Sequence, residues 1–477
     1  MILSQRSTLV VTMLATFLAV MDQFIINVAL PAIHRDLHAT TAEAEFAVSG
    51  YALVYGALLI TGGRLGDLFG FRRLFIIGVA TFTLASLGCG LAPTAEGLVA
   101  FRVLQGVGSA LFYPQVLAFL QTAFDGQSKA RAFSVFGAAV GLASVCGQVL
   151  GGLLVSLDLF GLSWRPVFLI NVPLGLVALV GGARLPASRG TARPQLDMVG
   201  VICLTSALLL LSVPLMGGPG WGWPWWSYAL LGLALPAVLV FVVWEGRVAR
   251  RGRLPLIDRG LFGQRVFAAG NGLALAFFAG NAGLFFVLTL HLQQDLDYTP
   301  LRSGLTFAPL TLAFIVASLV APRIQRRAGL HVLTLGYGLN LLGTVTLLVV
   351  ALAGHSEHAG IPWALLAALA VIGLGQGLGV SPLMGAVLTD VPRRHAGAAS
   401  GVMETTAQVG AALGTVVVGL VFQSAQRHSS TAFAEALTVN AGLSLTALVL
   451  MVFVLRRQEH EGPVDTPTAH TDPGLLS

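Results

Sequence analysis

The stretch Gly63-Arg-Leu-Gly-Asp67-Leu-Phe-Gly70-Phe-Arg72-Arg73 is a short charged segment between two long apolar ones. Residues 44–63 precede the charges and residues 74–92 follow them. A transmembrane helix needs about 20 mostly apolar residues, and both flanking segments meet that length. The charged connection is long enough only for a turn at the membrane surface, after which the chain re-enters the membrane. The stretch therefore predicts two antiparallel membrane-spanning helices.

The same alternation of apolar and charged segments continues over all 477 residues, of which 56% are hydrophobic and 10% charged. Ordinary globular domains carry about 25% charge, so this chain has too little polar surface for water. Cytosolic enzymes, secreted disulfide scaffolds and disordered or fibrous chains are excluded. The three cysteines lie in apolar stretches and form neither a disulfide framework nor a metal motif. The composition indicates an all-α polytopic membrane protein.

The length criterion gives fourteen candidate spans, which account for most of the chain. They are residues 8–30, 44–63, 74–92, 98–121, 132–156, 166–182, 198–216, 225–244, 266–291, 303–322, 332–353, 362–389, 398–424 and 433–455.

Basic residues gather on one side of this predicted topology. With a cytoplasmic N-terminus, the other side holds only Arg35, Arg165, Arg302 and Arg427, and Arg102 lies within a span. The remaining twenty-two of the 27 basic residues are then cytoplasmic, as the positive-inside rule requires. We expect a multi-pass protein of the inner (plasma) membrane with both termini in the cytoplasm. The net charge of +6 reflects topology, and no nucleic-acid partner is expected.

No loop is long enough for a soluble catalytic domain. The sequence contains no His-Glu-x-x-His, no Gly-x-Ser-x-Gly and no Walker lysine. We therefore expect no enzyme activity, no cofactor and no metal, and any pumping would draw on an ion gradient.

Away from the span ends, three charged residues remain inside the predicted spans: Asp22, Arg102 and Glu404. Charges in the bilayer are costly, which makes such residues functional candidates by default. Asp22 and Arg102 reach similar depths, and separating them would favour proton uptake by the carboxylate. We expect all three to serve proton coupling. A static pair that only holds helices together is the alternative for Asp22 and Arg102.

Polar and small residues form stripes on three of the spans. At 100° per residue, Arg102 shares a face with Gln105, Gly106, Ser109 and Tyr113, which would suit a water-filled cavity. Glu404 shares a face with Ser400, Gln408 and Thr415, and a cation-binding, snorkelling or gate-forming role remains open for it. The fifth span has a small-residue face that permits close helix packing. Its members are Gly137, Gly141, Gly147, Gly151 and Gly152.

These motifs together resemble the major facilitator superfamily, and within it the fourteen-span drug/proton antiporter branch of the multidrug or quaternary-ammonium resistance type. Asp22–Pro31 is similar to the first-span motif of that branch, and Gly63–Arg73 to the superfamily signature between spans two and three. Arg102–Gly108 resembles the fourth-span motif, and Gly147–Gly152 most of the fifth-span antiporter motif.

The resemblance implies the major facilitator fold, with two six-helix bundles and two extra central helices. The expected division is residues 1–185 for the first bundle, 186–262 for two additional helices and a basic cytoplasmic linker, 263–457 for the second bundle, and 458–477 for a disordered cytoplasmic tail. Transport would proceed by alternating access, in which one bundle rocks against the other.

The resemblance also assigns roles to residues. It implies a cytoplasmic charge latch made by Gly63, Asp67, Gly70, Arg72 and Arg73, which stabilises the outward-open state. The substrate cavity is expected to be lined by Asn27, Gln105, Ser109, Tyr113 and Gln408. The sequence departs from the family pattern at Phe24, where a threonine is usual, at Gln148, where a proline is usual, and at Glu404, where a neutral amide is common.

The expected function is proton-coupled export of hydrophobic or amphipathic small molecules, such as drugs or secondary metabolites. Its partners would be the small-molecule substrate, protons and the lipid bilayer, and a monomer would suffice for alternating access. A proton-coupled uptake carrier for a defined solute has the same fold and remains open. A non-transporting membrane sensor is the alternative from a different class.

Overall fold

The computed structural model is all-helical over the residues that it describes, which are all except 1, 40, 188–196, 252–254, 258, 299, 354–362, 390, 393–394, 427–430 and 461–477. Thirteen helices in this part of the chain are long and apolar enough to cross a membrane, and Pro166–Gly182 is a shorter apolar helix. Together they match the fourteen expected spans in number and order.

The first half of the chain forms seven helices and one 3-10 turn at Leu159–Gly161. The helices are α1 (Ile2–Asp36), α2 (Thr41–Phe69), α3 (Phe71–Leu91), α4 (Ala95–Thr122), α5 (Gly126–Leu157), α6 (Pro166–Leu169) and α7 (Asn171–Gly182). The predicted sixth span is thus divided between α6 and α7. Pro173 has no N–H to give the carbonyl of Leu169, the residue at which α6 ends.

The second half begins with a hairpin of two long helices, α8 (Met198–Trp221) and α9 (Trp225–Arg250), followed by the short α10 (Arg259–Gly263). The remaining helices are α11 (Arg265–Leu290), which continues as a π turn to Asp295, α12 (Pro300–Thr306), α13 (Ala308–Ala328), α14 (His331–Leu352), α15 (Trp363–Thr389), α16 (Ala396–Gln426) and α17 (Ala432–His460).

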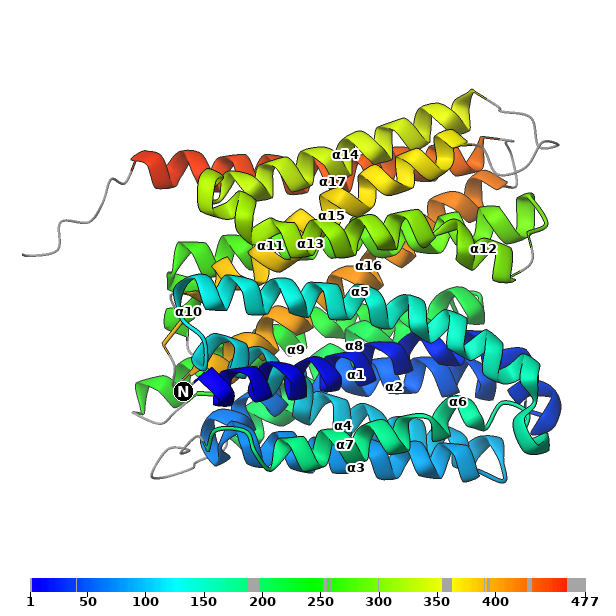
Figure 1. The fold of residues 1–477 in the computed structure, drawn as a ribbon, viewed down its shortest axis with the longest axis horizontal. Coiled ribbons are helices and arrows are strands. Elements are labelled where there is room, and N and C mark those ends of the chain that lie inside the picture. The colour runs from blue at the N-terminus through cyan, green and yellow to red at the C-terminus, as the bar shows by residue number, and fades with distance from the viewer. Residues whose placement is uncertain are drawn as a thin grey trace, which may run out of the picture.

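The helices pack as two bundles, α1–α7 and α11–α17, that lie side by side (Figure 1). α2 packs against α16 along one edge of the interface, and α5 packs against α13 and α15 along the other. α8 contacts both α2 and α16, so the inserted hairpin covers the first of these edges. α1 begins and α17 ends at the same end of the molecule, which we call the termini end (Figure 1).

Two predicted boundaries are wrong in a way that matters for the site. α2 was expected to end at residue 63 but continues to Phe69, because Arg64 and Asp67 are buried between helices instead of facing water. Gly70 then ends the helix with a φ of 95°, a conformation that favours glycine. α17 reaches His460, so residues 458–460 of the expected tail are helical, and 461–477 lie outside the described residues.

The glycine face of α5 serves two partners. A Cβ at Gly147 would lie 2.7 Å from the carbonyl oxygen of Met21, and one at Gly151 would lie 2.8 Å from that of Ile25, both on α1. A Cβ at Gly137 or Gly141 would instead collide with side chains of the other bundle, Ser381 or Phe314. Gly152, on the same helix, is half-buried. Small residues therefore permit close packing within one bundle and between the two.

Candidate functional site

Asp22 on α1 and Arg102 on α4 form an ion pair in the interior of the first bundle. The Nη1 of Arg102 lies 2.6 Å from Oδ2 of Asp22, and the two side chains are 1% and 0% exposed. Breaking a buried pair by removing one partner costs about 3–5 kcal/mol, because the remaining charge is stranded. The pairing predicted from the sequence is present, with both charges fully removed from solvent.

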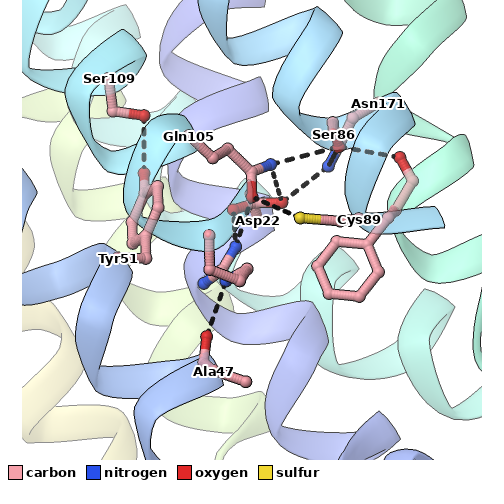
Figure 2. Close-up of polar contacts among 10 residues, drawn as sticks. Asp22, Ala47, Tyr51, Ser86, Cys89, Gln105, Ser109 and Asn171 are labelled. Carbon is pink, nitrogen blue, oxygen red and sulfur yellow. Dashed lines mark hydrogen bonds and ion pairs between the residues drawn. The ribbon is translucent and has the colours of Figure 1, made fainter. Parts of the chain in front are cut away.

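Asp22 is surrounded by hydrogen-bond donors (Figure 2). Its Oδ1 accepts from Nε2 of Gln105 at 2.9 Å and from Nδ2 of Asn171 on α7 at 2.7 Å. Both amides also donate to Oγ of Ser86, at 3.2 and 3.0 Å. An ionised carboxylate is an acceptor only, so this arrangement fits a charged Asp22.

Arg102 is held on its other sides by α2. Its Nε donates to the carbonyl oxygen of Ala47 at 2.8 Å, and Nη1 also donates to Oε1 of Gln105 at 2.7 Å. The guanidinium carbon lies 4.5 Å above the centre of the Tyr51 ring, a cation–π distance. The Tyr51 hydroxyl donates to Oγ of Ser109 at 2.8 Å (Figure 2). The guanidinium is thus fixed in position by groups from three helices.

A line of tyrosines leads from Arg102 to the second bundle. Tyr51 stacks on Tyr55 with ring centres 5.8 Å apart, and Tyr113 meets Tyr55 edge-on at 5.9 Å. The Tyr55 hydroxyl donates to Oε1 of Glu404 on α16 at 3.3 Å, and Nε2 of Gln408 donates to the same oxygen at 3.3 Å. The contact between Tyr55 and Glu404 crosses the interface between bundles.

Glu404 is 7% exposed, so it does not snorkel to the membrane surface. It lies in the ninth position of α16, which begins at Ala396. In the part of the chain that the structure describes, no group of three or more His, Cys, Asp or Glu side chains is placed to hold a metal ion.

At the termini end, side chains of the first bundle bind the main chain of the second. The Asp67 carboxylate accepts from the N–H groups of Gly397 and Ala398, at 2.8 and 2.9 Å. These belong to the first turn of α16, where N–H groups have no helical partner and the helix dipole favours an anion. Nε2 of Gln121 donates to the carbonyl oxygens of Leu388 and Val391, at 2.5 and 3.0 Å.

The backbones of α2 and α16 approach closely beside these bonds. A Cβ at Gly63 would lie 2.0 Å from the carbonyl oxygen of Gly397. Arg72 and Arg73 lie at the start of α3, half-buried and exposed, and neither forms an ion pair within the described residues. Of the residues expected to form the latch, Gly63 and Asp67 contact the start of α16, and Gly70 ends the helix that carries them.

A cavity of about 310 Å³ lies between the bundles, lined by α2, α8, α11 and α16. Of the five residues expected to line the substrate cavity, Gln408 is on its wall. Gln105 and Ser109 are instead fully buried in the network around Asp22 and Tyr51, and Tyr113 packs against Tyr55. Asn27 lies on α1, and its side chain is outside the described residues.

At the opposite end of the first bundle, hydrogen bonds join the last residue of α1 to the segment that precedes α6. Arg165 and the Trp164 indole both donate to Oδ2 of Asp36, at 2.5 and 2.9 Å. The hydrogen bond from Arg165, followed by that from Trp164, lowers the pKa of Asp36 below its ordinary value.

Several residues of the site were missed by the sequence analysis. Asn171, Tyr51 and Tyr55 are neutral residues that contact the three charged ones from other helices, and Ser86 accepts hydrogen bonds from Gln105 and Asn171. Asn171 had the clearest signal, because it is a polar residue within the apolar predicted span 166–182.

Comparison with known sequences gives one consistent match. The profile of the Major Facilitator Superfamily matches residues 12–201, 196–415 and 331–477. The chain is 39% identical over 414 residues to the probable actinorhodin transporter of Streptomyces coelicolor, covering 86% of this chain and 71% of that protein. It is 34% identical to the tetracenomycin C resistance and export protein of Streptomyces glaucescens, covering 87% of this chain and 76% of that protein.

Solved structures give the same fold. The crystal structure of the human organic anion transporter MFSD10 (TETRAN) superimposes with a TM-score of 0.69 at 15% sequence identity, covering 94% of this chain and 99% of that chain.

Proposed function

The chain belongs to the Major Facilitator Superfamily, and on that premise we propose that it is a proton-coupled exporter of hydrophobic or amphipathic small molecules. The observation that carries the proposal is the Asp22 carboxylate, buried within a bundle that must move and held by donors from α4 and α7. Relatives named for the export of, or resistance to, antibiotics support the direction of transport.

The geometry around Asp22 supports proton coupling. In the present conformation three donors stabilise its charge, from Arg102, Gln105 and Asn171. A rearrangement that withdraws Arg102 leaves a buried carboxylate without its counter-ion, and burial then favours the protonated form. The proton binds in one conformation and is released when Arg102 returns. Asp22 is thus the proton carrier, and Arg102 is the group that discharges it.

The contacts at the termini end support an outward-facing conformation. Asp67 and Gln121 hold the two bundles together there, whereas the cavity lies farther along the interface. Gln408 on the cavity wall is twelve residues beyond Ala396, about 18 Å along the helix at 1.5 Å per residue. With the termini end on the cytoplasmic side of the plasma membrane, as the arginine distribution favours, this is an outward-facing state of a monomer.

Glu404 extends the same chemistry to the second bundle. Its bond to Tyr55 links α16 to α2, and the stacked rings of Tyr55 and Tyr51 lead to Arg102. We assign Glu404 a second proton-coupling role, because a change in its charge alters a bond that crosses the interface between bundles.

Transport in everted membrane vesicles tests the proposal. Vesicles energised to an acidic lumen are supplied with ethidium or puromycin, and a lumenal pH dye reports proton movement. Export appears as uptake into these vesicles, accompanied by alkalinisation of the lumen. Asp22→Asn is expected to abolish both signals, while Glu96→Gln, an exposed carboxyl in the first turn of α4, retains them.

Two results would count against the function. Uptake by Asp22→Asn equal to the wild type would remove the coupling role. Absence of any proton-dependent uptake across a wide panel of compounds would favour a carrier of the opposite direction or a non-transporting protein.

A further inference from the structure

The cavity at the interface is built partly by a helix that belongs to neither bundle. Three residues of α8, Leu208, Ser212 and Leu215, form one wall. Gly56 of α2 and Gln408 of α16 belong to the facing walls. The inserted hairpin is therefore part of the boundary of this space and not only a packing element.

The two helices of the hairpin are in different environments. α8 packs against α2 and α16, whereas α9 packs chiefly against α8. Side chains of α9 such as Leu235 and Val240 are 67% and 58% exposed on the apolar surface. Leu208 and Ser212 of α8 are half-buried against the cavity. α9 thus faces lipid, and α8 separates the lipid from the cavity.

The walls have a consistent chemistry. None of the described side chains that line the cavity is charged, and hydroxyl or amide groups come from Ser212, Gln408, Thr415 and Gln423. Leu208, Leu215 and Phe286 supply apolar surface. Binding sites for small organic molecules combine an apolar lining with a few placed polar groups, in volumes of about 300–1,000 Å³. A volume of about 310 Å³ is at the small end of that range.

Small side chains on α2 create the room. A Cβ at Gly56 would meet only Cβ of Gln408, at 3.8 Å, which is ordinary van der Waals contact. Gln408 in turn donates to Glu404, so a molecule in the cavity contacts a group bonded to a proposed proton site. Substrate occupancy of the cavity and the protonation state of Glu404 are therefore connected through the side-chain amide of Gln408.

We propose that α8 forms the third wall of the substrate site and helps to set its specificity. The site takes amphipathic organic compounds, whose apolar body packs on Leu208 and Leu215 and whose polar edge bonds Ser212 and Gln408. This inference rests on the proposed export function, and it adds that the inserted hairpin contacts the substrate.

Filling the cavity from two sides tests the assignment. Leu208→Trp and Gly56→Leu are each expected to raise the KM for ethidium and puromycin about tenfold or more in everted vesicles, since 1.4 kcal/mol of lost binding is a factor of ten. Matched controls carry the same bulk on the lipid side. These are Ile202→Trp, 60% exposed on α8 itself, and Gly232→Leu on α9, whose Cβ would meet nothing within 4 Å. Both controls are expected to stay within about twofold of the wild type.

A labelling experiment covers the case in which a bulky variant does not fold. The natural cysteines Cys89, Cys146 and Cys203 are first replaced by alanine. Puromycin is then expected to slow N-ethylmaleimide labelling of Ser212→Cys at least about threefold and to leave Ile202→Cys unaffected. Protection of both positions alike, or of neither, would refute the assignment, as would a cavity-filling variant that lowers the maximal rate with an unchanged KM.

Failure of this inference is distinguishable from failure of the function. If export depends on Asp22 but the KM is unchanged in Leu208→Trp and Gly56→Leu and puromycin does not slow labelling at position 212, the role of α8 in the substrate site is rejected. The proposed export function then still stands. Loss of proton-dependent export in the wild type itself rejects both.

Discussion

Gly62 and Gly63 are neighbours in sequence, but their replacement by alanine is expected to have opposite consequences. A Cβ at Gly62 would lie 1.9 Å from the carbonyl oxygen of Ala110, on α4 of the same bundle. A Cβ at Gly63 would lie 2.0 Å from the carbonyl oxygen of Gly397, on α16 of the other bundle. Real Cβ atoms essentially never come closer than 3.0 Å to such an atom, so either backbone must retreat by at least 1 Å.

The two retreats differ in cost. Within a packed bundle, overpacking costs about 1–3 kcal/mol of folding stability. At Gly63, the collision is relieved when the two bundles separate as rigid bodies at the termini end. The same energy then shifts the equilibrium from the conformation closed at this end to one that is open there. A change of 1–3 kcal/mol alters that equilibrium about 5- to 150-fold. Separation also breaks the bonds from Asp67 to Gly397 and Ala398, which are only 2.8 and 2.9 Å long when the end is closed.

Spin labels at the termini end measure this shift. Arg73→Cys and Arg327→Cys place labels on exposed positions of α3 and α13 in a background without natural cysteines. Double electron–electron resonance is expected to show a longer distance in Gly63→Ala, with a melting temperature close to that of the wild type. Gly62→Ala is expected to lower the melting temperature, and Gly56→Ala to change neither quantity. Unchanged distances in Gly63→Ala, or loss of its fold, would refute the reasoning.

Three further predictions concern individual side chains. Arg102→Ala is expected to abolish export and to destabilise the protein by about 3–5 kcal/mol, because it leaves a buried charge without its partner. Arg102→Lys keeps the charge but lacks the planar guanidinium, so partial export is expected. Full activity of the alanine variant in the vesicle assay would contradict the role of Arg102. Glu404→Gln removes the proposed second proton site, so it is expected to lower export of the cation ethidium and of the uncharged dye Nile red by a similar factor, about tenfold, and a loss confined to ethidium would indicate charge selection and contradict the coupling role. The pKa of Asp36 is lowered, so its bond to Arg165 adds stability to the fold above pH 3.8, the ordinary pKa, and this stability is lost as the pH falls through the lowered pKa. The melting temperature of the wild type is therefore expected to lie slightly above that of Asp36→Asn at pH 7, with a smaller difference near pH 3. A difference that grows in acid would contradict this reasoning.

The number of helices was predictable because hydropathy is a local property of the sequence. The predicted span boundaries gave Asp22 and Arg102 similar depths in the membrane, and opposite charges at the same depth indicated an ion pair. The stripe of Gln105, Ser109 and Tyr113 was also visible, but periodicity along one helix does not reveal what faces it. Here Asp22, Tyr51 and Tyr55 fill that side.

The contacts between the two bundles could not be predicted from the sequence. The bond from Tyr55 to Glu404 joins residues 349 positions apart, and its register depends on how two bundles dock. Likewise, α8 was recognisable as a span, but apolar composition does not distinguish a helix in lipid from one that covers the α2 and α16 edge. The end of α2 was misplaced for the same reason, since charged residues near a span were read as facing water.

The bonds that close the termini end have main-chain atoms on one side. Asp67 binds two N–H groups, and Gln121 binds two carbonyl oxygens. Such partners do not change when a side chain is replaced. Residues around the start of α16 and the end of α15 can therefore vary widely without loss of closure. The exceptions include proline at 397 or 398, which deletes a donor, and bulk at 397 or 401, where a Cβ would lie 2.2 Å from the Gly63 oxygen or 2.7 Å from the Leu59 oxygen. Mutational tolerance at this end should thus be asymmetric, narrow in the first bundle and broad in the second.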